Sequence, residues 1–243
     1  MRILIVRHGD PDYAIDGLTE KGQREAELLA DRLTKEKIDK VYCSVLGRAR
    51  LTAKPTLDRL GIEAEYCEWL REFDYAAKVK FPYLEEETGC VWDVLPEYLN
   101  TLPEIYSPTE WYKSEFLRNT PIKEKYDAVC AEFDKVLAEF GYERDGYNYK
   151  AVRSNHDTLV FVCHYGLTAV LLSHIFNCSP YTIWQNMVAL TTSVTTIHTE
   201  ERVKGIASMR CCGFSDISHL AQGGEEPAFA ARFCECYDDD TRH

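Results

Sequence analysis

Two histidines in this chain stand directly after short apolar runs. Arg7-His8-Gly9 follows the run at 3–6, and His164-Tyr165-Gly166 follows the run at 159–163. Apolar runs of this length predict buried strands. In open α/β sheets the reacting groups gather just beyond the carboxyl ends of such strands. We therefore predict that His8 and His164 face each other across one pocket.

The residues beside these histidines favour phosphoryl chemistry. A neutral histidine can attack phosphorus through one ring nitrogen while a backbone carbonyl holds the other. Arginine binds the charged phosphoryl oxygens with paired donors in a rigid fork, and Arg7 and Arg48 are the candidates. Arg48 falls in the first turn of a predicted helix, where free N–H groups also attract anions. His164, if protonated, would add a further donor.

A leaving alkoxide needs a proton, so the pocket also needs an acid. Glu72, in Leu70-Arg71-Glu72, is the candidate general acid. Three other carboxylates stay open as alternatives because they lie close in the sequence, namely Glu68, Asp74 and Glu87. Glu72 could instead pair with Arg71 or with a surface lysine.

The elements that must position these residues can be read from the first part of the chain. Thr19 is a predicted N-cap for a helix that ends near Leu33. A strand at 40–43 leads to Ser44, a predicted N-cap for a second helix that Gly61 ends. Pro55 lies inside that second helix and predicts a kink or a restart. A further strand is expected at 62–67.

The middle of the chain differs in composition from the rest. Residues 73–149 are rich in aromatic residues, and prolines break the first part of this stretch into short pieces. Apolar residues at helical spacing then predict a helix over 126–140. We interpret 73–150 as an inserted helical cap, within a single domain that spans 1–243. The alternative is that these aromatic residues form the core of a helical subdomain.

After this segment the core elements resume. We expect a strand at 158–163, a helix at 165–176, and strands near 193–198 and 202–209. Strands that alternate with helices indicate a parallel sheet covered on both faces. The predicted fold is a three-layer α/β sandwich with a mainly parallel central sheet and a helical insertion over the pocket.

Charge and composition limit the possible partners. The chain has 243 residues and a formal net charge of −12, whereas nucleic acids and anionic membranes require a basic face. We therefore expect neither as a partner. A small phosphorylated substrate remains compatible with this charge, because a local cluster of arginines can dominate one site. Nothing in the sequence predicts the oligomeric state or the physiological substrate.

Location and metal content follow from the cysteines and from the apolar runs. The sequence contains no run of 18 apolar residues, so we predict no membrane span. The first strand carries a motif rather than a signal peptide. We expect a cytoplasmic protein whose ten cysteines are reduced. Cys211-Cys212 and Cys234-x-Cys236 do not have zinc-site spacing. We expect no metal and no other cofactor.

Four motifs occur in a fixed order, and together they resemble those of the histidine phosphatase superfamily, which includes the cofactor-dependent phosphoglycerate mutases. The stretch 18–22 is also typical of this family, and the resemblance covers 1–75 and 158–176. The four motifs are Arg7-His8-Gly9, Ser44-x-Leu46-x-Arg48-Ala49-x-x-Thr52-Ala53, Leu70-Arg71-Glu72 and His164-Tyr165-Gly166.

The resemblance implies a phosphoglycerate mutase-like fold and a role for each motif residue. His8 would be the nucleophile that forms a phosphohistidine, and Glu72 would be the proton donor. Arg7, Arg48 and His164 would form the phosphate pocket. The expected enzyme is a metal-independent phosphomonoesterase. Four residues close to the motifs are candidates for the lining of the substrate pocket, namely Asp10, Tyr13, Thr19 and Tyr165.

Other functions stay open. A mutase of this family would follow Arg-His-Gly with Glu-Ser and a nearby Asn, whereas here Asp10-Pro11-Asp12-Tyr13 follows. A non-catalytic member that binds a phosphorylated ligand would have no use for a proton donor. A dehalogenase-type phosphatase could use Asp10-x-Asp12, but its nucleophile should follow the strand immediately. A cysteine phosphatase needs Cys-x5-Arg, and Cys43 and Arg48 are one residue too close.

Overall fold

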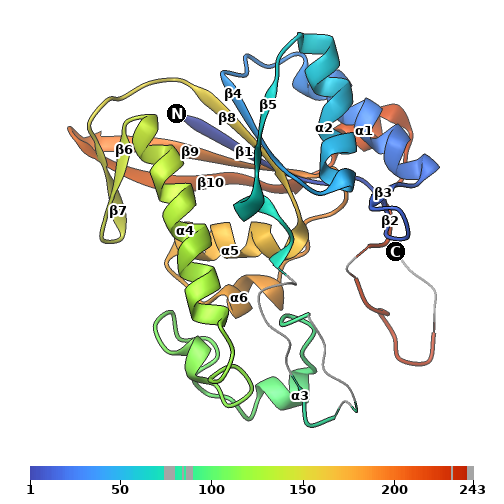
Figure 1. The fold of residues 1–243 in the computed structure, drawn as a ribbon, viewed down its shortest axis with the longest axis vertical. Helices are drawn as coiled ribbons and strands as arrows, with labels where there is room; N and C mark the ends of the chain where they lie inside the picture. The colour runs from blue at the N-terminus through green and yellow to red at the C-terminus, as the bar shows by residue number, and fades with distance from the viewer. Residues whose placement is uncertain (74–79, 84, 86–89, 231, 240–243) are drawn as a thin grey trace.

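The chain folds around one large sheet in the computed structural model, which describes residues 1–73, 80–83, 85, 90–230 and 232–239. Within these residues the sheet has eight strands in the order β5-β4-β8-β1-β9-β10-β7-β6 (Figure 1). Their bounds are β1 Arg2–Arg7, β4 Lys40–Ser44, β5 Ala64–Cys67, β6 Tyr142–Asp145, β7 Asn148–Ala151, β8 Thr158–Cys163, β9 Val194–Val203 and β10 Ile206–Asp216.

The strand directions divide the sheet into two halves. The four strands β5, β4, β8 and β1 pair in parallel. From β1 onward every pairing is antiparallel. Since only β9 and β7 run against the direction of β1, the predicted mainly parallel sheet is confirmed. Both histidine motifs follow strands of the parallel half, because β1 ends at Arg7 and β8 ends at Cys163.

Helices cover both faces of the sheet, as a three-layer sandwich requires. Successive residues of β1 point to opposite faces, so Ile3 and Ile5 join one apolar cluster while Leu4 and Val6 join the other. Helices α4 (Ile122–Glu139) and α5 (Tyr165–Phe176) pack into the first cluster, and α1 (Glu20–Leu33) and α2 (Gly47–Leu60) into the second. Figure 1 shows α1 beside α2, away from α4 and α5.

The second helix departs from its predicted start. Its N-cap is Leu46, which makes no side-chain capping bond, and the helix runs without a break through Pro55. The predicted cap by Ser44 is therefore wrong, and the helix does not restart at Pro55. Ser44 is the last residue of β4, and its hydroxyl is used by His164, as described below. By contrast, Thr19 caps α1 as predicted, since its hydroxyl accepts the Gly22 N–H at 3.0 Å.

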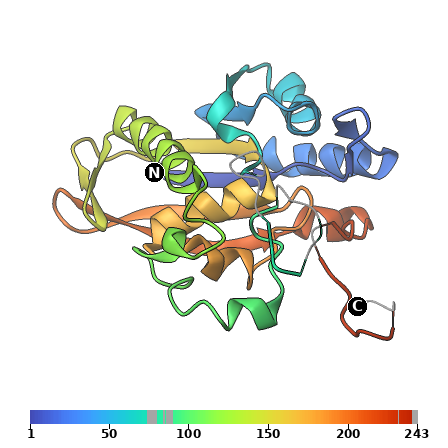
Figure 2. The same ribbon diagram turned by 60° about the horizontal axis from the view of Figure 1, so that its bottom comes forward.

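The range 73–150, interpreted above as an inserted cap, contains two kinds of structure. Its later part belongs to the sandwich, because α4 packs on the sheet and the β6–β7 hairpin extends the sheet through β10. Its earlier described part holds two short elements, α3 (Pro96–Leu99) and the 3-10 helix η3 (Trp111–Lys113). The segment around α3 lies next to α6 (Pro180–Trp184) in both views (Figures 1 and 2).

The remaining elements are small. A two-stranded hairpin, β2 (Pro11–Asp12) with β3 (Gly17–Leu18), follows the first histidine motif. The 3-10 helix η1 (Glu68–Leu70) leads to Glu72, and α7 (Ser218–Gly223) packs against α1. No helix in the described part of the chain is both long enough and apolar enough to cross a membrane.

Candidate active site

His8 lies immediately beyond the carboxyl end of β1 and is almost completely buried. Its Nδ1 lies 2.7 Å from the Gly9 carbonyl oxygen. A carbonyl can only accept, so Nδ1 carries the proton and Nε2 keeps its lone pair. Burial lowers the pKa of His8 well below its usual value, and the cations Arg7 and Arg48 lower it further. His8 is therefore a neutral imidazole with an available nucleophilic nitrogen.

His164 faces His8, with ring centroids 5.0 Å apart. Its Nε2 lies 2.8 Å from Ser44 Oγ, which also accepts the Leu46 N–H. We assign the Ser44 hydroxyl as the donor to Nε2, because this direction satisfies the proton of a buried hydroxyl. Nδ1 of His164 then carries the ring proton. Burial lowers the pKa of His164 well below its usual value, and His8 and Arg48 lower it further. His164 can thus donate a hydrogen bond without being positively charged.

Arg7, the last residue of β1, is held by main-chain carbonyls from two distant segments. Its Nη1 donates to the Ala189 oxygen at 2.7 Å and to the Ala230 oxygen at 3.2 Å. Its guanidinium lies over the Tyr165 ring, 5.8 Å from the centroid. Burial lowers the pKa of Arg7, and the nearby Glu72 carboxylate partly offsets this effect. These contacts fix the direction of the guanidinium.

Arg48 comes from the first turn of α2, and its side chain is only 9% exposed. Its Nη1 forms an ion pair with Asp16 Oδ1 at 2.6 Å. The ring of Tyr13 lies beside its guanidinium, at 5.4 Å from the centroid. Both contacts come from the turn between β2 and β3. This hairpin therefore closes one side of the site.

Three buried donors at this place have no hydrogen-bond partner among the described residues. They are Arg7 Nε, Arg48 Nε and His164 Nδ1. A buried donor without a partner costs about 1–3 kcal/mol, so three in one place indicate a site shaped for a ligand. His8 and His164 face each other with ring centroids 5.0 Å apart, and the charges of the two arginines lower the pKa of both histidines. An anion with several oxygens would satisfy these donors.

Glu72, which follows η1 in the chain, is buried against the first turn of α5. Its Oε1 accepts the Leu167 N–H in the first turn of α5 at 3.1 Å and the Phe73 N–H at 2.8 Å. The site packs tightly here, since a Cβ atom on Gly166 would lie 2.8 Å from Glu72 Oε1. Of the three alternative carboxylates, Glu68 is largely exposed, and Asp74 and Glu87 lie outside the described residues. The role of Glu72 as the general acid stays a prediction.

The predicted pocket-lining residues have varied positions. Tyr13 is 70% exposed beside Arg48. The Thr19 hydroxyl donates to Asp10 Oδ2 at 2.7 Å, so these two side chains hold each other. Tyr165 is buried, and its hydroxyl donates to the Trp184 oxygen. Of these four residues, Tyr13 and Tyr165 contact the arginine side chains of the site.

Three residues that had no predicted role in the site support it, although Ser44 and Thr52 belong to the second motif. Ser44 orients His164, and Thr52 Oγ1 accepts the Gly9 N–H at 2.9 Å. Glu25, fully buried on α1, accepts hydrogen bonds from the Asp10 N–H, the Thr191 hydroxyl and the Ala228 N–H. Burial raises the pKa of Glu25. A signal for Glu25 was present, because a carboxylate within the apolar stripe of a helix is unusual.

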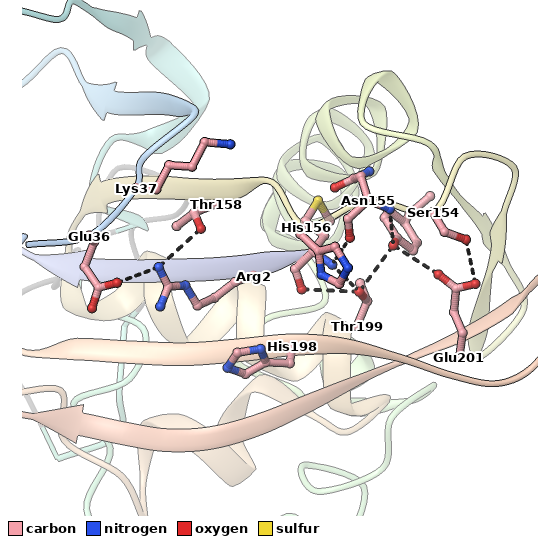
Figure 3. Close-up of a pocket in the computed structure, with 12 residues that line it drawn as sticks. Arg2, Glu36, Lys37, Ser154, Asn155, His156, Thr158, His198, Thr199 and Glu201 are labelled. Carbon is pink, nitrogen blue, oxygen red and sulfur yellow. Dashed lines mark hydrogen bonds and ion pairs between the residues drawn. The ribbon is translucent and has the colours of Figure 1, made fainter.

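A separate hollow of about 710 Å3 lies near the opposite ends of β1 and β8 (Figure 3). Arg2, His156 and His198 line it, but its polar groups largely bind one another. Arg2, for example, pairs with Glu36 at 2.8 Å. This hollow is distant from both histidine motifs. No cluster of three or more His, Cys, Asp or Glu side chains suited to a metal ion occurs in the described ranges.

The sequence of this chain is similar to those of several known proteins. Residues 3–89 match the family model of the histidine phosphatase superfamily (branch 1). Phosphoserine phosphatase 1 of Hydrogenobacter thermophilus is 23% identical over 217 residues, which cover 83% of this chain and 88% of that protein. A Schizosaccharomyces pombe protein named "Probable phosphatase" is 24% identical over 235 residues, with 90% and 95% covered.

The fold itself resembles solved structures. A mutant phosphoserine phosphatase of Entamoeba histolytica, solved in complex with phosphoserine, superposes with a TM-score of 0.59 at 16% sequence identity. The match covers 90% of this chain and 98% of that chain. The predicted phosphoglycerate mutase-like α/β fold is confirmed at this level.

Proposed function

We infer that this chain, a phosphatase belonging to the histidine phosphatase superfamily, hydrolyses a small phosphomonoester through a phosphohistidine formed on His8. The proposal includes that turnover needs no metal ion. The alternatives remain a phosphoglycerate mutase-type transfer and a non-catalytic phospho-ligand-binding protein. The substrate is proposed to be a small phosphorylated metabolite, in keeping with the phosphoserine bound to a structural neighbour.

One observation supports this function most directly. A neutral His8, with Nε2 available, lies beside three buried donors that have no partner within the described residues. These donors, Arg7 Nε, Arg48 Nε and His164 Nδ1, suit the three oxygens of a phosphoryl group. Two arginines supply the positive charge that Mg²⁺ supplies in other phosphoryl-transfer sites. A nucleophile and an anion pocket therefore occur together.

The first chemical step would transfer the phosphoryl group to the protein. His8 Nε2 attacks phosphorus, and the bond from phosphorus to the ester oxygen breaks. The Gly9 carbonyl holds the Nδ1 proton and stabilises the positive charge that develops on the ring. The Arg7 and Arg48 guanidinium groups stabilise the charge on the transferring oxygens.

Glu72 would serve both steps as acid and then as base. In its protonated form it gives its proton to the departing alkoxide. The resulting carboxylate then takes a proton from water, whose oxygen attacks phosphorus and breaks the bond to His8. Inorganic phosphate leaves, and Glu72 is protonated again. The backbone contacts of Oε1 hold the carboxyl group in place throughout.

The covalent intermediate provides the test. We expect rapid quenching with ³²P-labelled phosphoserine to trap an adduct that is stable in alkali and labile in acid, as a phosphoramidate must be. The His8→Ala variant should form no adduct, while His198→Ala should trap it as the unchanged chain does. Near-normal hydrolysis of p-nitrophenyl phosphate by His8→Ala would overturn the proposal. Isomerisation of a phosphoglycerate in excess over phosphate release would favour the mutase alternative.

We also propose a cytoplasmic location. The nine cysteines other than Cys90 are free thiols, as expected in a compartment where thiols stay reduced. Fractionation of the expressing cell, followed by detection of the chain, tests this location.

A further inference from the structure

The turn between β2 and β3 makes closer contact with the site than its sequence suggests. Asp16, in this turn, has a positive φ of 47°, a left-handed conformation that aspartate tolerates better than most residues. Its backbone oxygen lies so near α2 that a Cβ atom on Gly47 would come within 2.1 Å of it. The turn is therefore fitted against the first turn of α2.

The Asp16 carboxylate makes two different contacts there. Oδ2 accepts the Gly47 N–H at 2.6 Å, and Oδ1 pairs with Arg48 Nη1 at 2.6 Å. Because the N-cap residue Leu46 makes no side-chain capping bond, Asp16 acts as the cap of α2 from outside the helix. One carboxylate thus holds both the start of the helix and the arginine beside it.

Besides stabilising the start of α2, these contacts fix the direction of the Arg48 guanidinium. With Nη1 bound to Asp16 and the Tyr13 ring alongside, the guanidinium cannot rotate freely. Its Nε is then the buried donor that lacks a partner among the described residues. A guanidinium released from Asp16 would lose this direction. Ordering such a flexible side chain when a ligand binds would weaken binding.

We propose that Asp16 is a positioning residue, which orients Arg48 toward the phosphoryl group of the substrate. This inference rests on the proposed function. It concerns a residue outside the four motifs and outside the predicted pocket. Its carboxylate would not touch the substrate, and it acts through Arg48.

An opposing effect must be weighed against this role. The Asp16 carboxylate is 42% exposed and negatively charged, so it also repels a bound phosphate and competes for Arg48. If competition dominated, removal of Asp16 would strengthen phosphate binding. If positioning dominates, its removal weakens phosphate binding. The sign of the change therefore separates the two roles.

The experiment measures inhibition of p-nitrophenyl phosphate hydrolysis by inorganic phosphate. In Asp16→Ala we expect the inhibition constant to rise about 3- to 10-fold, with a similar loss in kcat/KM, which corresponds to ordering one side chain. Asp16→Asn, which tolerates the left-handed turn and keeps one acceptor, should give a smaller rise. A lower inhibition constant in either variant would overturn the proposal in favour of competition.

Two controls separate positioning from stability. Asp31→Ala removes a carboxylate that pairs with Arg59 at the same 2.6 Å distance on α1, away from the site, and should leave the inhibition constant unchanged. In an Arg48→Ala background, Asp16→Ala should have no further effect on inhibition but should still lower Tm. An undiminished effect in that background would mean that Asp16 does not act through Arg48.

The result is also distinguishable from failure of the proposed function. If His8 forms the phosphohistidine in the unchanged chain, but phosphate inhibits Asp16→Ala with an unchanged inhibition constant, only the positioning role fails. If His8→Ala remains active, the proposed chemistry fails whatever Asp16 does.

Discussion

The two ends of strand β1 carry the same types of side chain in very different settings. At its start Arg2 pairs with Glu36 at 2.8 Å, beside an open hollow that His156 and His198 also line (Figure 3). At its end Arg7 and His8 are buried with His164, and each arginine of the site keeps a donor without a partner in the described structure.

The two ends of β1 differ in burial and in hydrogen bonding rather than in residue type. Both ends offer histidine, arginine and glutamate. At the start of β1 the polar groups bind one another and reach water, so nothing requires a ligand. At its end, burial lowers the pKa values of His8 and His164 and leaves donors unsatisfied. Desolvation and unmet hydrogen bonds, rather than residue type, indicate the chemistry.

The largest predicted difference between the two ends of β1 is in the rate lost when a glutamate at each end is substituted. Glu72→Gln should slow hydrolysis of an alkyl phosphate such as phosphoserine by about 10²- to 10⁴-fold, the usual worth of a general acid. An aryl phosphate, with its better leaving group, should be slowed less. Steady-state rates of the variant and the unchanged chain on both substrates show whether the alkyl phosphate is slowed more than the aryl phosphate.

The control for that variant is Glu201→Gln at the opposite hollow, which should leave both rates unchanged. Equal slowing of the alkyl and aryl substrates by Glu72→Gln would assign Glu72 a packing role at α5. The proton donor would then be another carboxylate.

The arginines at the two ends of β1 give a second, smaller contrast. Arg7→Lys keeps the charge but loses the planar fork, so kcat/KM should fall about 10- to 100-fold, as expected for one or two charge-assisted hydrogen bonds. Arg2→Lys disturbs a partly buried ion pair away from the site and should change kcat/KM less than twofold. A comparable loss in both variants would show that Arg7 acts through stability alone.

The smallest predicted effect is a loss of stability in acid. His8, His164 and His219 have pKa values lowered by burial, that of His219 to about 4. The unfolded chain, with histidine pKa values near 6.5, takes up protons first as pH falls. Stability is therefore full above pH 6.5 and declines below it. His219 alone should account for about 1–2 kcal/mol between pH 7 and pH 5.

Urea unfolding at pH 7 and pH 5 measures this decline. His219→Gln, which cannot be protonated, should lose less stability over the same interval. Equal free energies of unfolding at the two pH values in the unchanged chain would contradict the lowered pKa values.

Much of the parallel half of the molecule was predictable from local patterns. Apolar runs gave β1 and β8, and the helix at 165–176 matches α5 in both bounds. The glycines after each histidine marked the places where backbone and side chains approach closely. The motif order then placed His8, Arg7, Arg48 and His164 in one site, where the structure brings them together.

The supporting contacts were not predictable, because they depend on tertiary neighbours. Ser44 looked like a helix cap, yet its hydroxyl is used by His164, 120 residues along the chain. The true cap of α2 is Asp16, which no local rule selects. The fully buried Glu25 joins three separate segments. The aromatic stretch 73–149 gave a composition but not the finding that α4 and the β6–β7 hairpin complete the sandwich.

The pairing of β1 has a consequence for synthesis of the chain. β1 pairs with β8 and β9, whose residues lie more than 150 positions later. At about 5–20 residues per second, the ribosome would need roughly 8–30 seconds to supply the first of these partners. For that time a nascent apolar strand has no edge to join and is exposed to aggregation. The segment that carries the proposed nucleophile is made early, but the sheet that shelters it closes only when most of the chain has emerged.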